Sequence, residues 1–383
     1  MTPVPPSDPA GPRPFGGALA GARILLTGHT GFKGSWLTLW LDHLGAEVRG
    51  IALAPDSRDA LYTVAGVEAH CDSRMADIND PQALDAAAQG FRPDIVIHMA
   101  AQAIVRDGYS DPAGTFATNV VGTANVLDLA RRQPSVTGVV VVSSDKCYEN
   151  NEWDWGYRET DPLGGSDPYS ASKACTELVA QAYRRSFFHD PTGPQLASAR
   201  AGNVIGGGDQ APHRLIPDIV RATRSGQRTV IRNPGSVRPW QHVLEPLAGY
   251  LTLSARLLDG CRPSAAGPWN FGPDTDATVS VGDLCRRLAR HWGEDAPRFE
   301  FGQEGPAPHE AGLLRLDSTK ARLRLGWHPR LALDEALALT ADWHRAHADG
   351  RDMHAVTLAQ IAAYQARLTS LSLDTIPHGL AAE

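Results

Sequence analysis

Ile24-Leu25-Leu26-Thr27-Gly28-His29-Thr30-Gly31-Phe32-Lys33-Gly34 is an apolar run that breaks into three glycines spaced three residues apart. The run predicts a buried strand, a tight turn and the first residues of a helix. Glycine suits such a turn because it accepts positive φ angles and lets a ligand approach the backbone closely. The free N–H groups and positive dipole end of the helix favour an anion, so the stretch predicts a site for a dinucleotide pyrophosphate.

The neighbours of this turn decide whether the glycine spacing has meaning, because 37 glycines in 383 residues also produce such spacings by chance. A broad apolar face follows from Trp36 to Leu44, and the apolar segment 46–53 predicts a second strand. A strand, a turn, a helix and a second strand in this order form a βαβ unit typical of dinucleotide-binding folds.

Strand and helix patterns continue to alternate after this unit. Strands are predicted at 72–78, 94–102 and 138–143, and helices at 80–89 and 111–132. Segment 138–143 is apolar almost throughout, which indicates a parallel sheet covered on both faces. We therefore expect an α/β fold built on a doubly wound parallel sheet.

Composition narrows the class of protein. No apolar run approaches the roughly 20 residues that a membrane helix needs, and residues 1–20 are expected to form a flexible tail on a cytoplasmic protein. The net charge of −7 argues against nucleic acid as a partner. Five scattered cysteines without a C-x-x-C pair predict reduced thiols and no metal site, and Cys147 is interpreted as a small filler near a strand end.

One stretch is basic within this acidic chain. Seven arginines and only two acidic residues lie between Arg200 and Arg238. Solvated helix surface accounts for some of them, such as Arg221 and Arg224. The remainder favours a phosphorylated small molecule as ligand.

Two polar segments follow the predicted strands. Ser143-Ser144-Asp145-Lys146-Cys147-Tyr148 stands at the carboxyl end of the strand 138–143, the edge at which open α/β sheets bind ligands. In Asp167-Pro168-Tyr169-Ser170-Ala171-Ser172-Lys173, Asp167 can cap a helix on which Tyr169 and Lys173 share one face. An ammonium beside the phenol is expected to lower the tyrosine pKa, so that Tyr169 can take a proton from a sugar hydroxyl as hydride leaves the same carbon.

Together these residues carry a family resemblance. The strings GHTGFKG, HMAAQ, Y-x-x-x-K and RAGNVIG resemble the extended short-chain dehydrogenase/reductases that act on nucleotide sugars. Within that group, SSDKCYEN, EWDWGYRE, LGGSDPYSASK, RAGNVIGGGD and RPWQHVLEPL resemble the CDP-glucose 4,6-dehydratases. The similarity covers most of residues 22–260 and is looser beyond Pro273.

The resemblance implies a Rossmann domain that binds NAD and a smaller C-terminal lobe that binds the sugar nucleotide. The implied boundaries are 21–203 plus about 238–272 for the first and 204–237 plus about 273–365 for the second, with a fraying C-terminus over 366–383. The implied cofactor-binding residues are Gly28, Thr30, Gly31, Phe32, Lys33, Gly34, Asp77, Ile78, Ala100, Ala101, Gln102, Asn119, Ser143, Tyr169 and Lys173. The implied catalytic residues are Ser144, Asp145, Lys146, Tyr169 and Lys173.

The basic stretch and the resemblance together suggest contacts to a CDP-hexose. These are Arg106, Asn203, Arg214, Arg232, Arg238 and Trp240, although core packing is an alternative role for Trp240. His98 and His242 are interpreted as packed histidines. The family further implies a homodimer or homotetramer.

Two departures from the family pattern affect the chemistry. Lys146 stands where related dehydratases have the glutamate that removes the C5 proton, so this base stays open. A charged Lys146 would also oppose the protonation that Asp145 needs as an acid. At the end of the second strand, Ala52-Leu53-Ala54-Pro55 replaces the usual acid that contacts the adenosine ribose, and Lys33 could tolerate a 2′-phosphate there.

The expected reaction is the conversion of CDP-glucose to CDP-4-keto-6-deoxyglucose with bound NAD. The alternatives are a 4,6-dehydratase of another nucleotide hexose, or an epimerase, decarboxylase or reductase of the same family. A non-catalytic NAD-sensing module is a further alternative, and the presence of both Tyr169 and Lys173 weighs against it.

Overall fold

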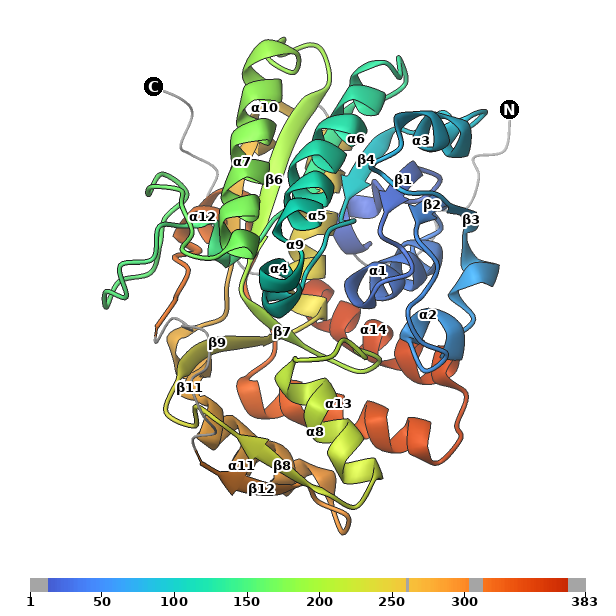
Figure 1. Ribbon diagram of the computed structural model, residues 1–383. Helices are drawn as coiled ribbons and strands as arrows, with labels where there is room; N and C mark the ends of the chain where they lie inside the picture. Colours follow the sequence, from blue (N-terminus) through green and yellow to red (C-terminus); the bar gives the residue numbers. More distant parts are fainter. Residues whose placement is uncertain (1–12, 260–261, 303–312, 371–383) are drawn as a thin grey trace.

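A seven-stranded sheet forms the centre of the computed structural model, which describes residues 13–259, 262–302 and 313–370 (Figure 1). Its strand order is β10-β6-β5-β4-β1-β2-β3, and every neighbouring pair is parallel. The strands are β1 (Arg23–Thr27), β2 (Glu47–Ala52), β3 (Asp72–Met75), β4 (Ile95–His98), β5 (Gly138–Val142), β6 (Gln195–Ala201) and β10 (Gly267–Phe271). The expected doubly wound parallel sheet is confirmed.

Helices cover both faces of this sheet, as the uninterrupted apolar strands predict. In β1, Leu26 packs with α1 (Phe32–His43), α9 (Leu244–Leu258) and α14 (Met353–Ser370), which lie on one face. Its neighbour Leu25 packs with α3 (Pro81–Ala88), α6 (Gly122–Arg131) and α7 (Pro168–Ser186) on the other. Successive strand residues therefore belong to two separate cores, because side chains alternate across a strand.

Asp80 and Asp167 cap the N-termini of α3 and α7, as the sequence predicts. The Asp80 carboxylate accepts from the backbone N–H groups of Gln82 and Ala83, and Asp167 accepts from that of Ser170. The single helix expected over 111–132 is divided. It comprises α5 (Pro112–Phe116), a π-helical turn η3 (Ala117–Val121) and α6.

The N-terminal expectation needs a correction. Residues 1–12 lie outside the described part, but residues 13–20 do not form the expected tail. They include a 3₁₀ turn, η1 (Pro14–Gly17), the buried side chain of Leu19, and Phe15, whose ring lies 5.8 Å from that of Trp40. Apolar contacts of Phe15 and Leu19 with the α1 side of the sheet outweigh the weak local pattern of this Pro/Gly-rich stretch.

The C-terminal helix is longer than expected. Helix α14 continues to Ser370, so residues 366–370 are helical, and residues 371–383 lie outside the described part. Its Tyr364 hydroxyl donates to the buried Glu245 carboxylate over 2.7 Å, and Trp40 Nε1 donates to Gln365 over 3.1 Å. Helix α14 therefore covers α1 of the large domain, although most of it was assigned to the smaller lobe.

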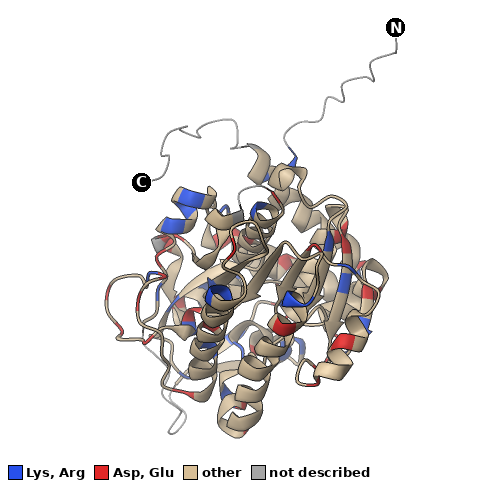
Figure 2. Ribbon diagram, turned by 90° about the horizontal axis from the view of Figure 1, so that it is seen from above, with Lys and Arg blue, Asp and Glu red and all other residues tan. Residues whose placement is uncertain are grey.

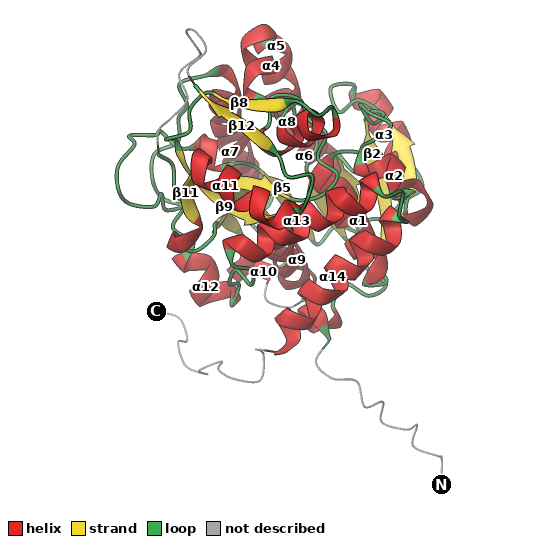
Figure 3. Cartoon of the chain, turned by 90° about the horizontal axis from the view of Figure 1, so that it is seen from below, coloured by secondary structure: helices red, strands yellow, loops and turns green. Residues whose placement is uncertain are grey.

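The smaller lobe lies beyond the carboxyl ends of the sheet strands (Figures 1 and 3). Its strands form two small sheets, one of order β11-β9-β7 and one of β12-β8. Its elements are β7 (Asn203–Ile205), β8 (Arg228–Ile231), β9 (Val237–His242), β11 (Thr278–Ser280), β12 (Arg298–Phe301), α8 (Leu215–Arg224), α11 (Val281–Trp292) and α13 (Leu333–Ala348). Residues 238–242 were assigned to the cofactor domain, but they pair with β7 and β11 here.

Short elements complete the chain. They are α2 (Leu61–Val64), η2 (Val67–His70), α4 (Val105–Ser110), η4 (Asp145–Cys147), α10 (Arg262–Ala265), η5 (Thr275–Ala277) and α12 (Thr319–Leu325). Seen from above, the positions of basic and of acidic residues are interspersed along the ribbon (Figure 2). Among the described helices, none has the length and apolar character needed to cross a bilayer.

Candidate active site

A cavity of about 880 Å³ lies between the carboxyl edge of the large sheet and the smaller lobe. Residues from both parts of the chain line it, including the ends of β2, β3 and β4 and the strands β7, β8 and β9. All but two of the predicted site residues meet in its wall: Gly28, Thr30, Gly31, Phe32, Lys33, Gly34, Asp77, Ile78, Ala100, Ala101, Arg106, Ser143, Ser144, Asp145, Lys146, Tyr169, Lys173, Asn203, Arg214, Arg232, Arg238 and Trp240.

The glycine turn lets a ligand come close to its backbone. Gly28 has φ +81°, and a Cβ there would lie 2.8 Å from the backbone nitrogen of Ala100. A Cβ on Gly34 would lie 2.0 Å from the carbonyl oxygen of Gly28. Gly31 precedes α1 and offers no side-chain cap to its first N–H groups. The turn therefore leaves helix N–H groups available for a pyrophosphate, and this part of the cavity fits a dinucleotide.

The adenosine end lacks the usual acid, as the sequence indicates. Ala52, Leu53 and Ala54 line the cavity after β2, and Leu53 is 62% exposed. The first carboxylate beyond them is that of Asp56, which also lines the cavity. The Thr30 hydroxyl donates to the Leu53 carbonyl over 2.8 Å and so fixes this strand end beside the glycine turn.

Ser144 and Asp145 form a hydrogen-bonded pair at the end of β5. The Ser144 hydroxyl caps the short turn η4 by accepting from the Lys146 N–H, and it donates to Asp145 Oδ1 over 2.9 Å. Asp145 is only 4% exposed, and burial raises its pKa against the lowering effects of Lys146, Ser144, Arg238 and Lys33. Burial therefore shifts the Asp145 pKa in the direction that an acid needs, because desolvation outweighs the nearby cations.

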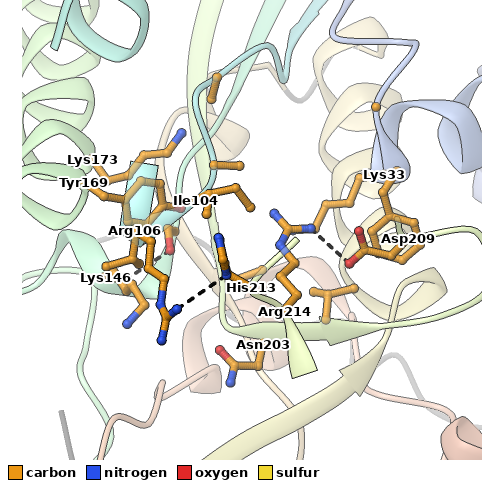
Figure 4. Close-up of a pocket in the computed structure, with 18 of the residues that line it drawn as sticks. Lys33, Ile104, Arg106, Lys146, Tyr169, Lys173, Asn203, Asp209, His213 and Arg214 are labelled. Carbon is orange, nitrogen blue, oxygen red and sulfur yellow. Dashed lines mark hydrogen bonds and ion pairs between the residues drawn. The ribbon is translucent and has the colours of Figure 1, made fainter. Parts of the chain in front are cut away.

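Tyr169 and Lys173 lie on α7, across the cleft from Lys33 (Figure 4). Burial raises the pKa of Tyr169 to about 12, while hydrogen bonding to Ser144 and the charge of Arg214 act to lower it. Burial also lowers the pKa of Lys173 to about 8. The expected lowering of the tyrosine pKa is therefore wrong for this state of the protein, because desolvation outweighs nearby positive charge.

Gln102 and Asn119 do not line the cavity and lie next to residues that do. Asn119 Oδ1 accepts from the Gln102 backbone N–H over 2.8 Å, and its Nδ2 donates to the Gln102 carbonyl and to the Ser172 hydroxyl. These bonds tie the loop after β4 to α7. Direct cofactor contacts of both residues stay a prediction, while these hydrogen bonds give them a supporting role.

Lys33 extends from α1 into the cleft (Figure 4). Its Nζ lies 3.5 Å from the hydroxyl of Tyr250 on α9. Burial, followed by the charge of Arg214, lowers its pKa to about 8, and the charges of Asp145 and Lys173 also reach it. Tolerance of a 2′-phosphate by Lys33 stays a prediction.

The lobe side of the cavity carries the predicted arginines. Arg232 and Arg238 line it, and the Arg106 guanidinium from α4 reaches His213 Nδ1 over 3.5 Å across the cleft (Figure 4). The lining residues that were not predicted include Asp209, His213 and Thr229. Only the GGGD string, which was noted for its resemblance, pointed toward Asp209.

Other arginines of the basic stretch are engaged elsewhere. Arg200 forms a buried ion pair with Glu177, while Arg221 pairs with Asp218 and Arg224 contacts His347 at the surface. The ligand-facing arginines are therefore only part of this stretch. A run of like charge in the sequence does not reveal which members have internal partners.

The histidines and cysteines are packed as interpreted. His98 is buried and bonds to the hydroxyls of Thr27 and Thr123, and His242 is buried against Trp36. Cys147 is fully buried at the end of η4. No group of three metal-ligating side chains occurs within the ranges that the structure describes.

Sequence comparison identifies the family. Residues 24–260 match the model of the NAD dependent epimerase/dehydratase family. A CDP-glucose 4,6-dehydratase of Salmonella typhimurium is 46% identical over 353 residues, which cover 91% of this chain and 98% of that protein. A dTDP-glucose 4,6-dehydratase of Streptomyces griseus is 30% identical over 85% of this chain and 94% of its own length.

Solved structures agree with this assignment. The dTDP-glucose 4,6-dehydratase DesIV of Streptomyces venezuelae, solved with NAD and TYD bound, superposes with a TM-score of 0.70 at 27% identity. That match covers 86% of this chain and 99% of DesIV. The UDP-glucose 4-epimerase of Thermus thermophilus, in complex with NAD, gives a TM-score of 0.71 at 26% identity over 84% of this chain and 99% of its own.

These matches confirm the resemblance given by the glycine turn and the Y-x-x-x-K helix, and with it NAD as the cofactor. The chain is an enzyme homologous to a CDP-glucose 4,6-dehydratase. It belongs to the NAD-dependent epimerase/dehydratase family.

Proposed function

We propose that this enzyme is a lyase that converts CDP-glucose to CDP-4-keto-6-deoxyglucose. The observation that carries the proposal is the meeting of Ser144, Asp145, Lys146 and Tyr169 beside the glycine turn in one cavity. The 46% identical relative has this named activity, and its length is matched almost completely. When bound, NAD accepts a hydride from the sugar and later returns it, so no external oxidant is consumed.

Tyr169 removes the proton of the C4 hydroxyl. Its side chain lines the cavity, and the Ser144 hydroxyl can give its single proton to Asp145 or to Tyr169, where it favours the phenolate. Lys173 lies one helical turn further along α7 and favours the phenolate through its charge. The resulting 4-keto group makes the C5 proton acidic.

Asp145 and Lys146 carry out the elimination of water. In its protonated form, the Asp145 carboxyl donates a proton to the departing C6 hydroxyl, a role that the upward direction of its pKa shift supports. We assign removal of the C5 proton to Lys146 in its neutral amine form, which lines the same cavity and stands next to Asp145 in the chain. Acid and base then act from one turn, η4, on neighbouring carbon atoms.

The cofactor is assigned to the wall that α1 and the strand ends provide. Gly28, Gly31 and Gly34 hold the pyrophosphate, together with Thr30 and Phe32. Asp77 and Ile78 border the adenine, and Ala100, Ala101 and Ser143 lie along the ribose and nicotinamide side. Gln102 and Asn119 hold this wall in place through their hydrogen bonds. Each assignment rests on position in the cavity.

The nucleotide of the substrate is assigned to the lobe. Arg232 and Arg238 supply cations for the diphosphate, with Asn203 beside them. Trp240 and Thr229 are buried lining residues, and Trp240 Nε1 and Thr229 Oγ1 lack a hydrogen-bond partner within the described chain. The polar edge of a nucleobase can satisfy such atoms, which favours a base at this place over simple core packing.

A panel of nucleotide sugars tests the proposal. CDP-, dTDP-, UDP- and GDP-glucose are incubated separately with the enzyme, and the products are analysed by mass spectrometry. Loss of one water from CDP-glucose, with kcat/KM at least about tenfold above the others, is expected. Preference for another nucleotide would support a dehydratase of that sugar, and an isomer of unchanged mass would support an epimerase instead.

We further propose a cytoplasmic homodimer. Apolar side chains on η3, on α7 and directly after α7 remain exposed, with Val121 at 54%, Leu178 at 51% and Phe187 at 51%. A patch of this kind favours association of two copies. Light scattering at micromolar concentration is expected to give twice the mass of the chain, and Leu178→Glu is expected to shift the mass toward that of the monomer.

A further inference from the structure

The loop between β7 and α8 is anchored firmly at its start. The Gly207 carbonyl accepts from Trp36 Nε1 over 2.9 Å, and a Cβ on Gly207 would lie 2.0 Å from the Trp343 ring. Gly208 follows with φ +81° and packs against Leu61. These contacts with α1, α2 and α13 fix where the loop leaves the protein interior and enters the cleft.

Asp209 then directs the rest of the loop. Only 5% of Asp209 is exposed, and its Oδ1 accepts from the Ala211 N–H over 3.1 Å. Its Oδ2 accepts from the Arg214 guanidinium over 3.1 Å. His213, immediately before Arg214, has φ +63°, an uncommon conformation for a residue with a side chain. The loop therefore holds a costly backbone conformation that brings Arg214 into the cleft.

The Arg214 guanidinium occupies the middle of the cleft. Figure 4 shows it between Lys33 on the α1 side and Tyr169 on the α7 side, with Asp209 facing it. Its charge lowers the pKa of both Tyr169 and Lys33. The groups acting on Tyr169 also include Ser144 and Asp145 from the β5 end and Asp167 from the start of α7, and Tyr250 on α9 is electrostatically linked to it.

We propose that Asp209 is a positioning residue for the reaction, which holds Arg214 where its charge supports deprotonation of Tyr169. The smaller lobe then contributes directly to acid–base chemistry on the large domain, beyond the contribution of Lys173. This inference rests on the proposed role of Tyr169, and it deepens the function of the same site. Asp209 itself needs no contact with the substrate.

Titration of the tyrosine tests the proposal without substrate. NAD-loaded protein is titrated by ultraviolet difference spectroscopy against the matching Tyr169→Phe protein, within the pH range where circular dichroism shows an intact fold. Asp209→Asn and Arg214→Gln are each expected to reduce the phenolate fraction, equivalent to a rise of roughly one pH unit in the midpoint. Arg214→Lys, which keeps the charge, is expected to restore part of the signal.

A double variant distinguishes positioning from a direct effect of the Asp209 charge. If Asp209 acts through Arg214, adding Asp209→Asn to Arg214→Gln changes nothing further. Asp283→Asn is the control, because Asp283 forms a comparable ion pair with Arg286 over 2.7 Å at the exposed surface of α11. An unchanged or increased phenolate fraction in Asp209→Asn would overturn the proposal.

Kinetics provides the second test. In the Asp209→Asn variant, we expect kcat to fall about tenfold with its rising pH limb displaced upward, while KM for the nucleotide sugar changes less. A rise in KM alone would reduce Asp209 to a role in substrate binding and contradict the proposal. If the wild-type protein dehydrates no nucleotide sugar, the proposed function fails, and the spectroscopic titration still decides the positioning role.

Discussion

The Glu177 carboxylate lies 2.7 Å from the Arg200 guanidinium, and both side chains are almost completely buried. Glu177 also accepts from the Ser198 hydroxyl, and Arg200 donates to the Tyr148 hydroxyl over 2.7 Å. The pair thus joins α7, which carries Tyr169 and Lys173, to β6 and to the end of the β5 segment. This network therefore holds α7, with Tyr169 and Lys173, in a fixed position relative to the segment after β5, which carries Ser144 and Asp145.

Removing one partner of this pair is expected to destabilise the fold strongly. Glu177→Ala leaves the Arg200 charge buried without its partner, so the free energy of unfolding is expected to fall by about 3–5 kcal/mol. Urea unfolding followed by circular dichroism measures this. The same change at the exposed Asp283 is expected to cost less than about 1 kcal/mol. Equal losses for the two variants would show that the buried pair has no special role.

The sequence predicts well those features that local chemistry determines. The glycine turn, the caps at Asp80 and Asp167 and the apolar strands depend on neighbours in the chain, and the structure has them where expected. The partner of Arg200 is 23 residues away on another element. No local pattern reveals such a pair, so Arg200 looked like one more basic residue.

A second limit concerns quantities that depend on burial. The Tyr169–Lys173 spacing correctly places both residues on one helix face, but the direction of the Tyr169 pKa shift depends on how far the cleft excludes water. The same holds for Lys33, whose place in GHTGFKG suggested a phosphate contact while its side chain extends to Tyr250. Leu19 gains its burial from helices far along the sequence.

Acid is expected to destabilise the protein because it contains buried neutral histidines. Burial lowers the pKa of His29 to about 4 and that of His98, His242 and His344 to about 3. The unfolded chain binds these protons near pH 6.5, so stability is complete above this value and is lost as the pH falls. Each histidine contributes about 1.4 kcal/mol per pH unit.

Two buried carboxyl groups oppose this trend. Burial raises the pKa of Glu245 to about 7 and also raises that of Asp145, so the folded state binds these protons first. Four protons taken up by the unfolded state and one, at Glu245, by the folded state leave a net loss of at most about 4 kcal/mol per pH unit between roughly pH 6 and 5, and the raised pKa of Asp145 reduces it. Urea midpoints across this range test the sign. His344→Phe should make the dependence shallower by about one proton, and stability that rises toward acid would contradict the assignment.

The glycine turn is expected to lose its ligand when a methyl group is added. Gly34→Ala would place Cβ 2.0 Å from the Gly28 carbonyl oxygen, so the turn must move. We expect at least about a hundredfold weaker NAD binding by calorimetry or fluorescence, equivalent to roughly 3 kcal/mol. Gly235→Ala is the control, because a Cβ there meets no atom within 4 Å. NAD affinity unchanged in Gly34→Ala would remove the turn from the binding site.

The hydroxyl of Tyr169 is expected to be needed for turnover but not for retention of the cofactor. Tyr169→Phe keeps the ring, which is 8% exposed, and removes only the group that exchanges a proton. Turnover is expected to fall by at least about a thousandfold, while the purified protein retains bound NAD in wild-type amount. A variant with near wild-type turnover would transfer the role of base to another residue.

The most direct measurement follows a deuterium atom from C4 of the sugar. CDP-glucose deuterated at C4 is converted in ordinary water, and the product is examined by mass spectrometry and NMR. The proposed mechanism predicts loss of one water and retention of the deuterium in a new C6 methyl group, because the hydride passes from C4 to C6 within one active site. Deuterium that is lost to solvent, or that remains on a C4 epimer of unchanged mass, would contradict it.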